Sequence, residues 1–146
     1  MKWQDLAATS HYQTAVAVEE AIDRGDIADA HVGIQELIDA LSRSEKRALR
    51  SQLIRLMMHI IKWKTQPERR STSWCVSILS ARREIEDIQE DTPSLSRSVI
   101  NSLWDKCFRA AKKEAEIEMG KSAAVSKLTW AQVFDQDYDL NGKNGK

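Results

Sequence analysis

Apolar side chains recur every third or fourth position over most of the chain, which is the spacing of amphipathic helices. The pattern is strongest between Ser44 and Pro67, where two apolar rows run side by side. A helix that is apolar over most of its circumference is buried on nearly all sides. We therefore predict a central helix from Ser44 to the residue before Pro67. Its two rows are Leu49, Leu53, Leu56, Ile60 and Trp63, and Ile54, Met57 and Ile61.

The same spacing, read with helix start and stop signals, predicts the remaining helices. Gly25 and Gly120 are expected C-terminal stops, and Thr92-Pro93 is an expected start, with Pro at the first helical position. Thr129 and Gln132 have the spacing of a capping box. The predicted helices cover residues 5–23, 29–41, 44–66, a segment from Ser71 or Ser73 past Ile88, residues 93–119 and, as a short helix, 129–134.

The predicted fold is therefore all-α, a compact bundle of about five main helices plus a short C-terminal helix. Residues 1–134 are expected to form a single helical domain. Residues 135–146 are polar and Gly-rich and are expected to form a flexible tail. With 5 Gly and 2 Pro among 146 residues, the chain also has too few turn signals for an all-β domain.

Cysteine use and hydropathy indicate the compartment. Cys75 and Cys107 belong to no C-x-x-C pair, and two free thiols suit a reducing cytoplasm. The N-terminal residues show no apolar signal segment, and no apolar run approaches the roughly 20 residues of a membrane-spanning helix. We expect a soluble cytoplasmic protein with no membrane association.

The formal net charge of +0 conceals a segregated pattern. Residues 1–42 carry 2 basic and 8 acidic groups, residues 43–83 carry 11 and 2, and residues 84–146 carry 9 and 12. The basic middle is either a phosphate-binding surface or the internal complement of acidic neighbouring helices. The second interpretation is favoured, because a dedicated nucleic-acid domain is usually net basic. The candidate anion-binding residues are Arg43, Lys46, Arg47, Arg50, Lys64, Arg69 and Arg70.

A polar stripe crosses the central helix. Arg55, His59, Lys62 and Gln66 share one helical face within an otherwise apolar segment. Near cations, a partly buried His59 can act as an acid or base, but a histidine hydrogen-bonded within the core is the favoured interpretation. A buried Lys62 needs a counter-charge. Glu36 and Asp39, from the preceding predicted helix, are the expected counter-charges for Lys62 and complete the candidate set.

The chain lacks the short motifs that carry common chemistry. It has no H-x-x-x-H or E-x-x-H metal pattern, no Gly-rich phosphate loop and no G-x-S-x-G nucleophile turn. We therefore assign no catalytic residue, and expect no metal and no cofactor.

Three segments nevertheless have a recognisable sequence: residues 44–49 (SEKRAL), 56–63 (LMMHIIKW) and 66–74 (QPERRSTSW). Together with Arg82-Arg83 and residues 132–138, they resemble the bacterial family called domain of unknown function 29. The resemblance implies an all-helical fold and no established activity. The family's second helix tends to be rich in glutamates, and here Glu36 and Asp39 are its clearest acidic residues.

Three functions compete, and each predicts a different surface. A protein-interaction module, the favoured function, predicts an exposed apolar or aromatic patch and another protein as its partner. A nucleic-acid-binding protein predicts one exposed basic face within residues 43–83. An enzyme, the least favoured, predicts a pocket that contains His59 with a carboxylate within hydrogen-bond reach.

Overall fold

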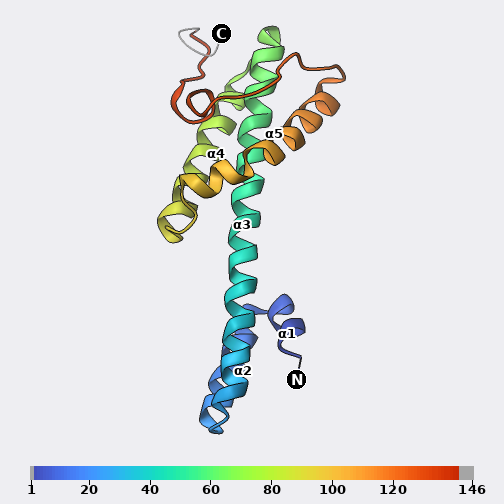
Figure 1. Cartoon of the computed structure of the whole chain (residues 1–146). Helices are drawn as coiled ribbons and strands as arrows, with labels where there is room; N and C mark the ends of the chain where they lie inside the picture. The colour runs from blue at the N-terminus through green and yellow to red at the C-terminus, as the bar shows by residue number, and fades with distance from the viewer. Residues whose placement is uncertain (1, 142–146) are drawn as a thin grey trace. The chain divides into compact units, whose positions relative to one another are not determined.

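The computed structural model describes residues 2–141, and this part of the chain contains helices and no strand. The predicted all-α class is confirmed. Residues 142–146 of the expected tail lie outside the described residues. The long elements, labelled in Figure 1, are α1 (Trp3–Thr9), α2 (His11–Asp23), α3 (Ile27–Thr65), α4 (Thr72–Asp91) and α5 (Arg97–Met119). Two short turns complete the chain: the 3-10 turn η1 (Pro67–Arg69) follows α3, and the π-helical turn η2 (Ala131–Asp135) follows α5.

The chain divides into two compact units, Met1–Arg47 and Ala48–Lys146. The boundary falls within α3, so the first part of this helix belongs to the first unit and the rest to the second. The first unit therefore contains α1, α2 and the start of α3. The second contains the end of α3 together with α4, α5 and the two short turns.

The predicted helix over residues 5–23 is two helices, because Ser10 interrupts it. The Ser10 backbone is extended, with φ −155° and ψ 115°, and its hydroxyl accepts a hydrogen bond from the Gln13 N–H at 3.0 Å. That is the geometry of an N-cap, which satisfies one of the free donors at the start of α2. The serine therefore ends α1 and begins α2.

The first unit has a small core in which a glycine is required. The core contains Trp3, Ala17, Val18, Ala21 and Ala30. The Trp3 ring lies so close to Gly33 that a β-carbon there would be 2.7 Å from it. The indole Nε1 donates to Asp29 Oδ1 at 2.8 Å, which holds the ring against α3. Gly33 is therefore a packing residue.

The predicted boundary between helices 29–41 and 44–66 is wrong, because α3 runs without interruption through 39 residues. Leu41 to Ser44 contains neither Gly nor Pro, the residues that most strongly end a helix. Serine inside a helix has only a modest cost, so the potential cap at Ser44 remains unused.

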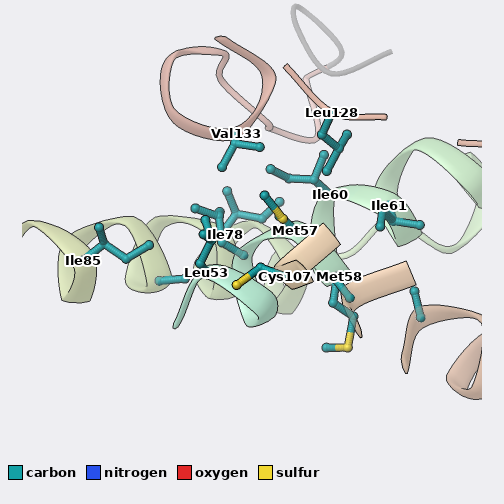
Figure 2. Close-up of a cluster of buried hydrophobic side chains, with 14 of the residues drawn as sticks. Leu53, Met57, Met58, Ile60, Ile61, Ile78, Ile85, Cys107, Leu128 and Val133 are labelled. Atoms are coloured by element: carbon teal, nitrogen blue, oxygen red, sulfur yellow. The ribbon is translucent and has the colours of Figure 1, made fainter. Parts of the chain in front are cut away.

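The second unit is built around the end of α3, as the two apolar rows predicted. Leu49, Leu53, Leu56, Ile60 and Trp63 are all fully buried. Figure 2 shows part of this core, in which Leu53 and Met57 of α3 lie among side chains of later segments. Those residues are Ile78 and Ile85 of α4, Cys107 of α5, Leu128 and Val133.

Of the two predicted ends of α5, the stop at Gly120 is confirmed and the start at Pro93 is wrong. The helix begins at Arg97 and not at Pro93, because residues 92–95 form a turn in which the Leu95 N–H donates to the Thr92 carbonyl at 2.9 Å. Leu95 is buried in that turn. Gly120 ends the helix with φ 70°, a left-handed conformation that glycine adopts without strain.

The C-terminal turn has the predicted capping box. The Thr129 N–H donates to Gln132 Oε1 at 2.8 Å, and the Gln132 N–H donates to Thr129 Oγ1 at 3.2 Å. Beyond η2, within the segment expected to be a flexible tail, Tyr138 is buried. Its ring meets Trp63 edge-on, with centroids 5.9 Å apart. The chain therefore packs on the second unit at least as far as Tyr138.

Candidate functional site

The polar stripe of α3 is present and is only partly accessible. Lys62 and Gln66 are buried, while Arg55 and His59 are half-buried. His59 Nδ1 lies 2.9 Å from the Arg55 carbonyl oxygen, one turn earlier, and donates to it in the tautomer protonated at Nδ1. Arg55 Nη1 in turn donates to Gln52 Oε1 at 2.8 Å. Arg55 and His59 are thus hydrogen-bonded within their own helix.

The environment of His59 disfavours its charged form. Burial lowers the pKa of His59, and the hydrogen bond to the Arg55 carbonyl opposes this effect. The cations of Lys62 and Arg55 lower the pKa further, and Glu118 raises it. Its bonded partner is a carbonyl and not a carboxylate, so the acid–base pair expected of an enzyme is not formed at Nδ1.

Lys62 has a counter-charge, but not the expected one. Its Nζ donates to Glu118 Oε1 of α5 at 2.8 Å and lies 5.0 Å from the centre of the Trp74 ring. The expected pairing with Glu36 or Asp39 is wrong, because both acids lie earlier on α3 itself, in the first unit. The expectation assumed two separate helices that could face one another.

The candidate anion-binding residues are divided between the units. In the second unit, Arg70 Nε donates to the Trp63 carbonyl at 2.9 Å, and its guanidinium lies 4.7 Å from the Trp63 ring centre. Arg70 therefore supports the end of α3. The others in that unit are Arg50 and Lys64, which are half-buried, and Arg69, which is exposed.

In the first unit, the basic residues Arg43, Lys46 and Arg47 are exposed. Two of them, Arg43 and Arg47, line a cavity of about 330 Å³ together with His11 at the start of α2. The rest of the lining is formed by Ala7, Ala8, Thr9, Ala40 and Ser44, so the wall contains no carboxylate. This cavity has the charge and hydrogen-bond donors that suit a small anion.

A row of exposed aliphatic residues lies on α3 in the first unit. The sequence analysis did not predict that this row is exposed. Ile27, Ile34, Ile38 and Leu41 are between 39% and 62% exposed. Their separations of seven, four and three residues place them on one helical face. We call these four residues the apolar stripe.

The apolar stripe adjoins a groove between α2 and α3. The groove encloses about 280 Å³ and is lined by Val18, Ile22, Ile27, Ala30, His31 and Ile34. Ile22 of α2 is itself 51% exposed. The exposed aliphatic surface therefore extends from one helix to the other within the first unit.

Two neighbouring faces of α3 explain why the stripe was missed. Ala30, Gly33 and Ala40 form the buried face, and the large aliphatic residues lie on the face beside it. Helical spacing predicts that a helix forms but does not say which apolar face is packed. The sequence did hold one signal for the packed face: small residues (Ala30, Gly33 and Ala40) lie on one helical face, and large aliphatic residues lie on the face beside it.

Other chemistry is weakly represented in residues 2–141. No group of three or more His, Cys, Asp or Glu side chains there is arranged to hold a metal ion. Cys75 and Cys107 are unpaired, and burial raises the pKa of both thiols. None of the helices described has both the length and the apolar character to span a bilayer.

A comparison with protein families identifies the chain. The model of the family described as Domain of unknown function DUF29 matches residues 12–139. The chain belongs to the DUF29 family. No curated protein and no solved structure gives a significant match.

Two segments that carried the resemblance to DUF29 meet in the second unit. Arg82 Nε donates to the Val133 carbonyl at 2.8 Å, and Arg82 Nη2 donates to the Gln136 carbonyl at 2.7 Å. The Tyr138 hydroxyl donates to the Gln132 carbonyl at 2.7 Å, and burial raises the pKa of Tyr138 to about 12. These DUF29 residues close the end of η2 and hold it against α4.

Proposed function

We propose that this DUF29 protein is a non-enzymatic protein-interaction module whose binding surface is the apolar stripe of the first unit. The observation that carries the proposal is the exposure of Ile27, Ile34, Ile38 and Leu41 in one row. Fully burying one such side chain contributes roughly 1.5–3 kcal/mol of hydrophobic free energy. The apolar area that these four side chains leave in water is therefore available to stabilise a complex. Contiguous apolar patches on soluble proteins usually mark binding surfaces.

The core of the first unit does not contain these four side chains. That core is made by Trp3 of α1, by Ala17, Val18 and Ala21 of α2, and by Ala30 on another face of α3. The stripe is therefore available for a partner.

The spacing of the stripe indicates the chemistry of that partner. Aliphatic residues separated by three, four and seven positions form the seam by which one helix packs along another. The partner is an amphipathic helix that lays its apolar face on the stripe and into the groove beside it. The two free thiols lead us to place the interaction in the reducing cytoplasm.

The experiment is site-specific photo-cross-linking in the native host. A photo-reactive amino acid replaces Ile38 in one variant and Leu79, an equally exposed residue of α4, in a control variant. We expect an adduct of defined mass with a protein at position 38 and not at position 79. The adduct should disappear when Ile34→Lys and Leu41→Lys are added. Equal labelling at both positions, or none at position 38, would contradict the proposal.

A second candidate function is anion binding in the cavity lined by Arg43 and Arg47. The observation that favours it is a lining with two guanidinium groups and no carboxylate. Binding of a short single-stranded RNA should then weaken steeply between about 50 and 200 mM salt. It should also be lost with Arg43→Glu/Arg47→Glu and retained with Arg69→Glu. The absence of binding at the lower salt concentration would eliminate this candidate.

A further inference from the structure

We infer that the helix occupying the apolar stripe is α3 of a second copy of this chain, running antiparallel to the first. This inference rests on the proposed function, because it names the partner of the same surface. The two copies of α2 and the start of α3 then form a four-helix arrangement around a shared apolar seam.

The stripe is self-complementary in an antiparallel arrangement. When two copies of α3 cross at Ile34, Ile27 of one copy lies opposite Leu41 of the other, and the same contact recurs at the other end of the seam. Such a two-fold contact uses one patch twice, as most homodimers do. Each copy contributes the same four aliphatic side chains, so the seam contains no acidic or basic side chain from the stripe itself.

The charges at the two ends of the stripe decide the orientation. At one end, residues 19–29 carry five carboxylates (Glu19, Glu20, Asp23, Asp26, Asp29) and the single cation Arg24. At the other end, residues 42–47 carry three cations (Arg43, Lys46, Arg47) and the single carboxylate Glu45. An antiparallel pair places the acidic end of each copy beside the basic end of the other, whereas a parallel pair places like charges together.

The flanking acids are positioned to take part. Glu19 and Asp23 of α2 are exposed and directly follow Val18 and Ile22, which line the groove. Lys46 is exposed and lies five residues beyond Leu41 of the stripe. In the antiparallel arrangement, the net acidic segment 19–29 of each copy therefore lies near the net basic segment 42–47 of the other.

The first measurement is sedimentation equilibrium of the full chain. We expect a dimer at micromolar concentration, and for Ile34→Lys/Ile38→Lys a dissociation constant raised at least about tenfold. The matched control is Val76→Lys/Leu79→Lys, which places the same charges on exposed aliphatic positions of α4 and should remain dimeric. Circular dichroism of each variant checks that the helices are retained.

The second measurement reports orientation. In a Cys75→Ser background, Ile27→Cys and Leu41→Cys are prepared separately, then mixed and oxidised. An antiparallel dimer gives the mixed disulfide between positions 27 and 41. A parallel dimer gives only the two symmetric disulfides, 27 to 27 and 41 to 41, and would overturn the orientation.

A charge-reversal series tests the same point with the stripe intact. Glu19→Lys/Asp23→Lys and Arg43→Glu/Lys46→Glu should each weaken the antiparallel dimer about tenfold, and the chain with all four changes should recover. A wild-type monomer at about 100 µM overturns the second copy as the partner. In that case, an adduct with a different protein at position 38 in the host leaves the proposed function standing, and no adduct removes both.

Discussion

Arg82 Nε donates a hydrogen bond to the carbonyl oxygen of Val133 at 2.8 Å, which joins α4 to a turn 51 positions later in the chain. The same guanidinium also reaches the Gln132 and Gln136 carbonyls. A single charged side chain thus satisfies the carbonyls at the end of η2. Arg83, the next residue, is exposed and offers a matched comparison.

We expect Arg82→Ala to lower the free energy of unfolding by about 2–4 kcal/mol, because the charge-assisted hydrogen bonds to the Val133 and Gln136 carbonyls are lost. Arg82→Lys should recover only part of the loss, since an ammonium group cannot reproduce the planar guanidinium contacts. Urea unfolding of both variants and of Arg83→Ala measures this. An Arg82→Ala variant as stable as Arg83→Ala would show that the contact is not needed.

The Lys62–Glu118 pair gives an asymmetric prediction. The Lys62 side chain is 11% exposed and the Glu118 side chain 51% exposed. Glu118→Ala leaves a buried ammonium without its counter-charge, whereas Lys62→Met removes the charge and retains the packing. We expect Glu118→Ala to cost about 1–2 kcal/mol and Lys62→Met to cost less.

The control for the pair is Glu114→Ala, an exposed position one turn earlier on α5 that should be nearly neutral. Chemical denaturation of the three variants and of the Lys62→Met/Glu118→Ala double variant measures the coupling. A ranking in which Lys62→Met is the more damaging change would contradict the pairing.

Stability should fall on mild acidification, because of His59. Burial lowers its pKa in the folded state below the ordinary value of about 6.5. As the pH falls from the unfolded pKa toward the lower folded pKa, the unfolded chain binds more protons than the folded one. The contribution of His59 is therefore complete above about pH 6.5 and is lost as the pH falls through the folded pKa.

We test this by measuring the free energy of unfolding between about pH 5 and 7.5. His59→Gln should reduce the slope, while His31→Gln, at an exposed position, should leave it unchanged. The charged groups that affect the pKa of His59 are Lys62, Arg55 and Glu118. If the slope is identical with and without His59, it arises from other groups.

We expect Gly33→Ala to destabilise the protein, although a glycine-to-alanine change usually stabilises a helix. Replacing glycine by alanine inside a helix normally stabilises the helix by about 0.8–1.0 kcal/mol. Here the new methyl group would lie 2.7 Å from the Trp3 ring, which must move away and strain its hydrogen bond to Asp29. We expect a net loss of stability, together with faster hydrogen exchange in α1, whereas a net gain would mean that Trp3 repacks without cost.

The sequence predicted the helices better than their surfaces. The buried rows around Leu53 and the stop at Gly120 could be predicted, because each depends on periodicity or on one residue's backbone preference. The interruption at Ser10 and the continuity of α3 past Ser44 could not, because a serine only offers a cap and tertiary packing decides whether it is used.

The candidate site was harder to predict for the same reason. The polar stripe could be described from helical spacing, but the Lys62 partner depends on which helix lies opposite, and Glu118 is 56 positions away. The apolar stripe could not be separated from core by composition, since Ile34 and Ile38 are as apolar as Ile60 and Ile61. Only the fold shows that α1 and α2 cover the neighbouring face.

The central claim is that the aliphatic residues of the stripe serve binding and not folding. The most direct measurement is the free energy of unfolding of Ile34→Lys/Ile38→Lys, compared with the wild type and extrapolated to low protein concentration so that association does not contribute. The account predicts a difference within about 0.5 kcal/mol, as for substitutions at exposed positions. A loss of more than about 3 kcal/mol would place these side chains in the core of the protein and contradict the account.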